Sequence, residues 1–168
     1  MYQLRTLNYS FISILILLFA CSDNNDIPTE NYLRVRVNGV EWEAFQINIQ
    51  KQEVNSGEVE ISIVATSDLN EAVIIGIQAF ENELQGRTQE VTSLANGDFF
   101  GYRSPGAGTG LETHSSFGCS SIDGTIFIEE YNAEEGYISG SFGGTVCEQG
   151  GQNPITLTEG TFTRLAFD

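Results

Sequence analysis

Apolar and polar residues alternate along this chain, and turn residues interrupt the alternation at short intervals. This combination restricts the fold more than any other feature of the sequence. In residues 33–37, leucine and valine alternate with Arg34 and Arg36, which is the period of a half-buried β-strand. Asn38-Gly39 follows directly and is the strongest short-range signal for a β-hairpin. The pattern predicts antiparallel strands with one face toward a core.

Segments of the same kind recur along the chain, with turn signals roughly every eight to twelve residues. The predicted fold is therefore all-β, either a mostly antiparallel β-sandwich or a flattened barrel, and the pattern does not distinguish the two. Residues 81–97 are expected to form a loop or one helical turn, and residues 104–110 and 147–153 form glycine-rich loops. Strands are expected over residues 33–37, 40–50, 59–63, 73–80, 98–103, 125–131, 137–146, 155–157 and 161–167.

Two of these segments carry further information. Residues 73–80 are almost continuously apolar and rich in β-branched side chains, which favours a central strand covered on both faces. Gly140, Gly143 and Gly144 lie inside one strand, where glycine indicates a bulge, a sharp bend or the close approach of another backbone.

The first residues form a separate unit. Arg5 precedes an apolar run over residues 11–19, about half the ~20 residues that a membrane-spanning helix needs, as in a secretory signal peptide. The segment that ends it, Leu-Phe-Ala-Cys21, resembles the lipobox of bacterial lipoproteins, in which the cysteine becomes the lipidated N-terminus. The resemblance implies that Cys21 is lipidated. We expect a signal peptide (1–20), a flexible linker (21–31), because this stretch is polar, contains Pro28 and lacks periodicity, and a single β domain (32–168), because the remaining length suits one core.

The composition is strongly acidic. The chain has 7 Lys and Arg against 23 Asp and Glu, and the loss of Arg5 leaves 6 against 23, a formal charge of −17. This charge argues against nucleic acid as a partner, because phosphates need clustered basic side chains. It also argues against electrostatic binding to anionic lipid. We therefore expect attachment to the membrane through acyl chains such as palmitate on Cys21, of which stable anchoring needs two or more.

Two cysteines remain when Cys21 is lipidated. An exported protein lies in an oxidising compartment, so Cys119 and Cys147 are expected to form a disulfide. The two residues lack the C-x-x-C spacing of a zinc or redox site, and no cofactor is expected.

Both ends of the β domain resemble one family. Residues 37–44, Val-Asn-Gly-Val-Glu-Trp-Glu-Ala, look like the V-N-G-x-x-W-x-A start of small bacterial lipoproteins in which one β-rich domain follows a lipobox and a short linker. The segments 136–142 and 155–162 look like the closing pattern of that family, G-x-I-x-G-x-F and then I-T-x-G-x-F. The family has no established activity, so the resemblance implies location and fold but no chemistry.

The residues after Cys21 bear on location. Asp23 and Asp26 resemble, at lower density, the acidic signals that send some lipoproteins to the outer face of the outer membrane. We expect an outer-membrane lipoprotein that is periplasmic or surface-exposed.

A catalytic site would have to use His114, the only histidine. A Ser–His–acid triad would take it as the base, with Asp123 or Glu112 to orient it. No G-x-S-x-G segment accompanies it, and a Cys119 nucleophile is incompatible with the disulfide. The loop 106–110 lacks the Gly-Lys-Ser/Thr ending of a phosphate-binding loop. We expect a solvated histidine in a polar loop and no catalytic residue.

Acidic side chains gather around the turn that follows residue 131. Calcium takes six to eight oxygen ligands, which such a turn can supply in part. The spacing departs from the D-x-[DN]-x-[DN]-G pattern of an EF-hand, so a solvated acidic turn is predicted and no metal. The alternative is a calcium site formed by Glu129, Glu130, Asn132, Glu134 and Glu135.

Aromatic residues suggest a ligand-binding patch. Phe99 and Phe100 are neighbours in a strand, so they point to opposite faces, and one of them is exposed unless both faces are covered. Trp42 alternates in phase with Ala44 and is expected in the core. The hypothesis is a patch formed by Phe99, Phe100 and Tyr102 that stacks on sugar rings.

The sequence as a whole predicts a lipid-anchored, non-enzymatic β domain of the bacterial cell envelope. Its expected role is that of a binding or accessory module for a glycan, a peptide or a partner protein. The alternatives are a structural envelope lipoprotein without a small ligand and, after that, a hydrolase.

Overall fold

The segments predicted as strands pair with one another throughout the domain. The computed structural model describes residues 31–91, 97–106 and 110–167, which contain eleven strands and two short 3-10 helices. They are, in chain order, β1 (Tyr32–Val37), β2 (Val40–Glu43), β3 (Gln46–Asn55), β4 (Glu58–Thr66), β5 (Ala72–Phe80), η1 (Glu81–Glu83), β6 (Thr88–Glu90), β7 (Phe99–Pro105), β8 (Leu111–Ser115), η3 (Ser116–Gly118), β9 (Gly124–Asn132), β10 (Tyr137–Glu148) and β11 (Gln152–Ala166).

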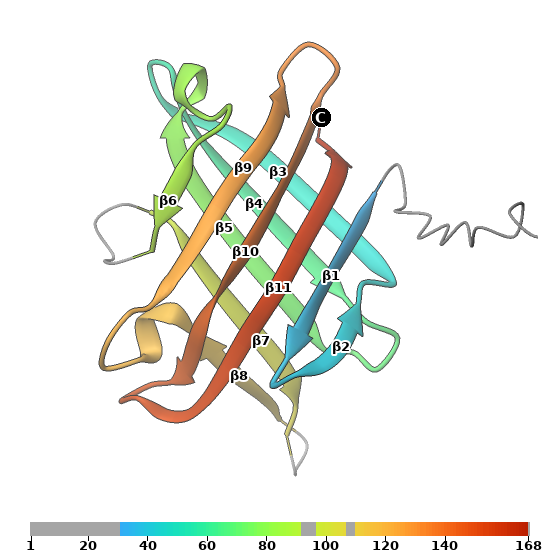
Figure 1. The fold of residues 1–168 in the computed structure, drawn as a ribbon, viewed down its shortest axis with the longest axis vertical. Coiled ribbons are helices and arrows are strands. Elements are labelled where there is room, and N and C mark those ends of the chain that lie inside the picture. Colours follow the sequence, from blue (N-terminus) through green and yellow to red (C-terminus); the bar gives the residue numbers. More distant parts are fainter. Residues whose placement is uncertain (1–30, 92–96, 107–109, 168) are drawn as a thin grey trace, which may run out of the picture.

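The strands form one antiparallel sheet that folds over into two layers (Figure 1). The front layer has the order β6-β9-β10-β11-β1-β2, and the back layer has the order β8-β7-β5-β4-β3. The layers are joined where β10 pairs with β8 through a single residue pair, Cys147 with Ser115. Over the described residues β2 and β3 end the series and do not pair with each other, so the sheet is not closed. The predicted all-β, mostly antiparallel fold is confirmed in its sandwich form.

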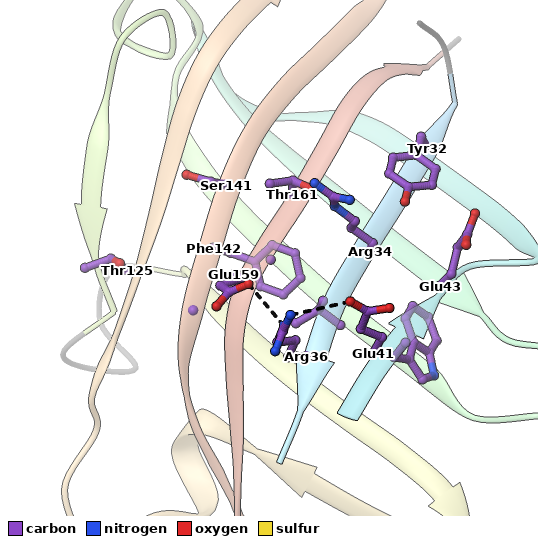
Figure 2. Close-up of a pocket in the computed structure, with 14 residues that line it drawn as sticks. Tyr32, Arg34, Arg36, Glu41, Glu43, Thr125, Ser141, Phe142, Glu159 and Thr161 are labelled. Atoms are coloured by element: carbon purple, nitrogen blue, oxygen red, sulfur yellow. Dashed lines mark hydrogen bonds and ion pairs between the residues drawn. The ribbon is translucent and has the colours of Figure 1, made fainter. Parts of the chain in front are cut away.

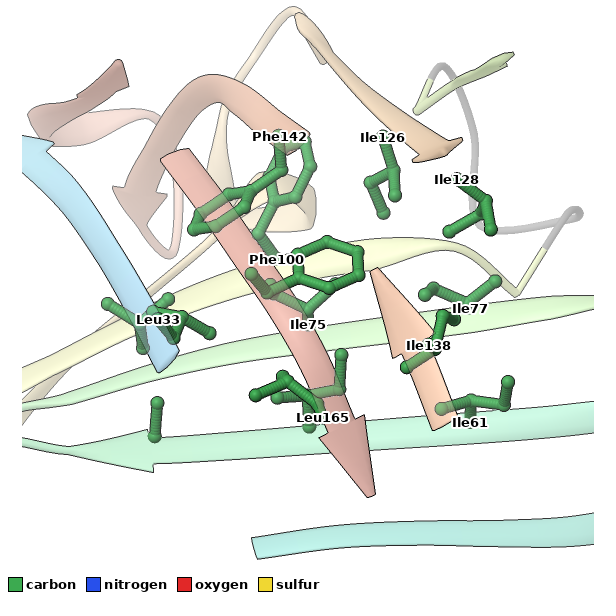
Figure 3. Packing of buried hydrophobic residues seen from close by; sticks show 14 of the residues in the cluster. Leu33, Ile61, Ile75, Ile77, Phe100, Ile126, Ile128, Ile138, Phe142 and Leu165 are labelled. Atoms are coloured by element: carbon green, nitrogen blue, oxygen red, sulfur yellow. The ribbon is translucent and has the colours of Figure 1, made fainter. Parts of the chain in front are cut away.

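The core lies between the two layers. Phe142 of β10 packs against Phe100 of β7 and Phe162 of β11, with ring centres 6.5 and 6.4 Å apart. Figure 3 shows isoleucine and leucine side chains of both layers meeting around these rings. The largest side chains with less than 2% exposure are Phe100, Phe162, Leu33, Ile61, Ile63, Ile75, Ile77, Leu84, Ile126, Ile128, Ile138 and Leu157.

Local sequence explains several elements directly. The alternation in β4 becomes strict alternation of buried and half-buried residues, and β5 is buried along most of its length on both faces, as predicted. The β1–β2 turn places Asn38 and Gly39 at φ of 50° and 80°, a left-handed conformation that these two residues tolerate best. Trp42 of β2 is 7% exposed, which confirms its predicted place in the core.

The glycines of β10 are explained by close backbone approach. A Cβ atom on Gly140 would lie 2.2 Å from the carbonyl oxygen of Phe127, and one on Gly144 would lie 2.5 Å from that of Asp123. The pairing of β10 with β11 also shifts register beside both glycines. The predicted bulges and close approach are therefore confirmed.

Several strands differ from the prediction. The predicted strand 40–50 is two strands, β2 and β3, which lie in different layers, and the predicted strands 155–157 and 161–167 are one strand, β11. β6 and β8 were not expected, because Thr-Gln-Glu and Leu-Glu-Thr-His-Ser carry no run of alternating apolar residues. They are strands because β9 and β7 supply the partners for their backbone groups.

The predicted signal peptide, Cys21 and all but the last residue of the predicted linker lie outside the described residues. Among the residues that are described, no helix has the length and apolar character needed to cross a bilayer.

Candidate functional site

The prediction that Phe99, Phe100 and Tyr102 form an exposed aromatic patch is wrong. Phe100 and Tyr102 are 0% and 5% exposed, because both point between the layers. Tyr102 is held there by a hydrogen bond of 2.7 Å from its hydroxyl to Glu71. Phe99 points to the opposite face, as its neighbour position requires, and packs half-buried against Phe117 with ring centres 5.9 Å apart. Alternation therefore places Phe100 and Tyr102 on the inner face and Phe99 on the outer face.

The expectation for His114 is also wrong. It lies in β8 and is 2% exposed, with its ring packed against Tyr102 at 6.4 Å between centres. Its Nε2 atom is 3.7 Å from Glu148 Oε1, and its Nδ1 atom has no hydrogen-bond partner within the described part of the chain. Cys119 is bonded to Cys147, as predicted, so it offers no thiol nucleophile. This geometry does not provide an accessible nucleophile and base.

The acidic turn between β9 and β10 is organised by its own hydrogen bonds. Asn132 Oδ1 accepts the backbone N–H groups of Glu134 and Glu135 at 3.0 and 2.9 Å. Glu130 accepts the hydroxyl of Tyr137 at 2.6 Å. In the described ranges no three His, Cys, Asp or Glu side chains are arranged to hold a metal ion. Asn132 therefore closes the turn that carries Glu134 and Glu135, whereas Glu129 and Glu130 belong to strand β9.

One carboxyl group is buried away from these residues. Asp98 is 1% exposed, and its Oδ1 atom accepts the backbone N–H of Gln78 at 2.9 Å. Burial raises the pKa of Asp98, opposed by the hydrogen bond from Gln78 and by the charge of Arg87. Raised carboxyl pKa values are found at active sites. Here the hydrogen bond joins the residue before β7 to β5, and the second carboxyl oxygen, Oδ2, has no hydrogen-bond partner among the described residues.

A groove of about 720 Å³ crosses the outer face of the front layer (Figure 2). It is lined by residues of β1, β2, β9, β10 and β11. This volume is within the roughly 300–1,000 Å³ typical of ligand-binding clefts. None of the residues that the sequence proposed as a ligand patch lines it.

The floor of the groove consists of small side chains on adjacent strands. The register places Thr161 of β11 between Arg34 of β1 and Ser141 of β10. Gly143 of β10 lies beside Thr125 of β9. Small side chains leave space above the sheet, and their hydroxyl groups can both donate and accept hydrogen bonds.

One wall of the groove comes from the hairpin of β1 and β2. Leu33 and Val35 point into the core, so Arg34 and Arg36 point outward into the groove. Tyr32 precedes them on the same face, and Glu41 and Glu43 of β2 pair with Arg36 and Arg34 in register. The wall therefore combines guanidinium and carboxylate groups with one aromatic ring.

A bulge in β11 shapes the middle of the groove. Thr158 pairs with Arg36 and Thr161 with Arg34, so Glu159 and Gly160 together face a single residue of β1. Glu159 has φ of 53°, a left-handed conformation that is costly for a residue other than glycine. At Gly160 a Cβ atom would lie 2.6 Å from the ring of Phe142. The bulge turns Glu159 toward the wall, where its Oε2 atom lies 3.1 Å from Arg36 Nε.

The sequence contained part of the signal for this site. Arg34 and Arg36 stand at alternate positions of one strand, although only six basic residues follow the predicted signal peptide. That pattern predicted an exposed strand face but not its partners. Thr161, Ser141 and Thr125 carry no local signal, because they become one surface only through strand pairing.

No protein-family model, no curated protein and no solved structure matches this chain.

Proposed function

We propose that this protein is a lipid-anchored, non-catalytic binding module of the bacterial cell envelope, and that its groove holds a glycan. The observation that carries the proposal is the polar lining of the groove on the outer face of the front layer. Arginines supply hydrogen-bond donors, glutamates supply acceptors, and serine and threonine hydroxyls supply both. Sugar hydroxyls need partners of each kind, and Tyr32 adds an aromatic ring at the wall.

A glycan fits this lining better than a protein partner does. Protein interfaces are usually anchored by large aromatic or aliphatic side chains in well-packed pockets. The two large aromatic residues that line the groove, Trp42 and Phe142, are only 7% and 5% exposed. Their rings are packed in the core and offer little surface to a protein partner. The side chains that a ligand would meet are charged or hydroxylated.

A blocking substitution tests the groove. Thr161 lies at the centre of the floor, so Thr161→Trp should fill the groove without entering the core. We expect the full chain, purified in detergent, to bind selectively on a glycan array, and Thr161→Trp to weaken that binding at least tenfold. Gln50→Trp is the matched control, because Gln50 is an exposed residue of β3 in the back layer. Equal binding by the Thr161 variant, or an array without any selective signal, would contradict the proposal.

The anchor has its own test. Lipidation at Cys21 should place the protein in the membrane fraction through its acyl chains, because a chain with 6 basic and 23 acidic residues has no electrostatic attraction to anionic lipid. We expect Cys21→Ala to move the protein to the soluble fraction or to leave the signal peptide uncleaved, as judged by fractionation and mass. Cys21→Ala protein that is cleaved and remains in the membrane would refute lipid anchoring.

A further inference from the structure

The two arginines of the groove differ in their partners. Arg36 is held between two carboxylates, with Nη2 3.4 Å from Glu41 Oε1 and Nε 3.1 Å from Glu159 Oε2. Arg34 has no carboxylate within ion-pair distance in the described part of the chain. Its guanidinium carbon lies 5.9 Å from the centre of the Tyr32 ring. Arg36 therefore already pairs with two carboxylates of the protein, whereas the N–H donors of Arg34 are available to a ligand.

Arg34 differs from the other basic residues by its place in the groove. Lys51, Arg36 and Arg164 each lie within 4 Å of a glutamate oxygen, whereas Arg34, Arg87 and Arg103 have no ion pair among the described residues. Of these three arginines only Arg34 lines the groove, and it has no such pair even though Glu43 is opposite it in register.

We infer that Arg34 binds a carboxylate of the ligand, so that the glycan held in the groove carries an acidic sugar. This inference rests on the proposed function and narrows its ligand class. A guanidinium group presents paired N–H donors in a planar fork that matches the two oxygens of a carboxylate. The ring of Tyr32 lies beside the guanidinium group and can support it in the groove.

The charge of the chain limits the number of acidic groups on the ligand. A formal charge of −17 over residues 21–168 repels a polyanion, and Glu41, Glu43 and Glu159 add local repulsion within the groove. At physiological ionic strength the Debye length is about 8 Å, so a carboxylate in contact with Arg34 is governed mainly by its immediate neighbours. The expected ligand is thus an oligosaccharide with a single acidic sugar, which lies in the groove, and otherwise neutral sugars.

Matched pairs of glycans test the inference. The probes are 3′-sialyllactose and oligosaccharides that end in one glucuronic acid, each as free acid and as methyl ester, within an array that also carries lactose and other neutral glycans. We expect the full chain in detergent to bind at least one free acid ten or more times more tightly than its methyl ester. Arg34→Gln should lower binding of the acid much more than binding of the ester, so that the preference for the acid is lost.

Two further variants separate the contact from general electrostatics. Arg34→Lys keeps the charge but loses the fork, and it should recover only part of the affinity. Arg103→Gln removes the same charge from β7 in the back layer and should change affinity less than twofold. Melting temperatures establish that each variant is folded.

The outcomes distinguish the two proposals. If acids and esters bind equally, or if Arg34→Gln leaves acid binding unchanged while Thr161→Trp abolishes it, the carboxylate inference is overturned and the groove remains the binding site. If no glycan on the array binds, both the inference and the proposed function fail.

Discussion

Phe100→Ala is expected to lower the free energy of unfolding by about 3–5 kcal/mol, because it removes a fully buried ring and leaves a cavity. Phe100 is 0% exposed and packs against Phe142 across the two layers. Its sequence neighbour provides the matched control. Phe99 lies half-buried on the outer face of the back layer, so Phe99→Ala should cost only about 1 kcal/mol.

Urea or guanidinium unfolding of both variants and the parent chain measures this difference. The midpoint should fall with little change in the dependence on denaturant if the fold is retained. Similar losses for the two variants would mean that residues 99 and 100 are not divided between surface and core. A loss below about 1 kcal/mol for Phe100→Ala would contradict its place at the centre of the packing.

Removing the disulfide is expected to cost about 3–4 kcal/mol, the loop-closure value for cysteines 28 residues apart. Cys119 follows η3 at the end of the back layer, and Cys147 lies in β10 of the front layer. In the described ranges, the one residue pair that links β8 to β10 includes Cys147. The bond therefore holds the seam between the layers, where backbone pairing is sparse.

The double variant Cys119→Ala/Cys147→Ala tests this role without leaving a free thiol. Its unfolding should be unaffected by reductant, whereas the parent chain should lose a comparable amount of stability when it is reduced. A double variant as stable as the oxidised parent chain would show that the crosslink contributes nothing to the fold.

Much of the fold could be predicted because it is encoded in local alternation. Side chains of a strand point to opposite faces in turn, so the pattern of residues 33–37 identified both a strand and its inner face. The same rule placed Trp42 in the core and separated Phe99 from Phe100. The choice of Phe100 and Tyr102 for a surface patch failed because alternation does not say which face is covered.

His114 shows a second limit of prediction from local sequence, which concerns burial. It stands among polar residues, which is typical of a loop, yet pairing of β8 with β7 buries it beside Tyr102. A polar neighbourhood in sequence becomes a buried one when another strand covers it. β6 was missed for a related reason, since its three residues acquire strand geometry from β9.

The sequence by itself determined the all-β class, the hairpin at Asn38-Gly39 and a disulfide between Cys119 and Cys147. The fold class follows from local periodicity, the hairpin from the chemistry of its turn, and the disulfide from there being only two cysteines left to pair. Only the tertiary structure decided which strands form each layer and which residues share the groove. Thr161, Ser141 and Arg34 are distant in the chain and become neighbours through strand register, a property of pairs of segments that no single segment contains.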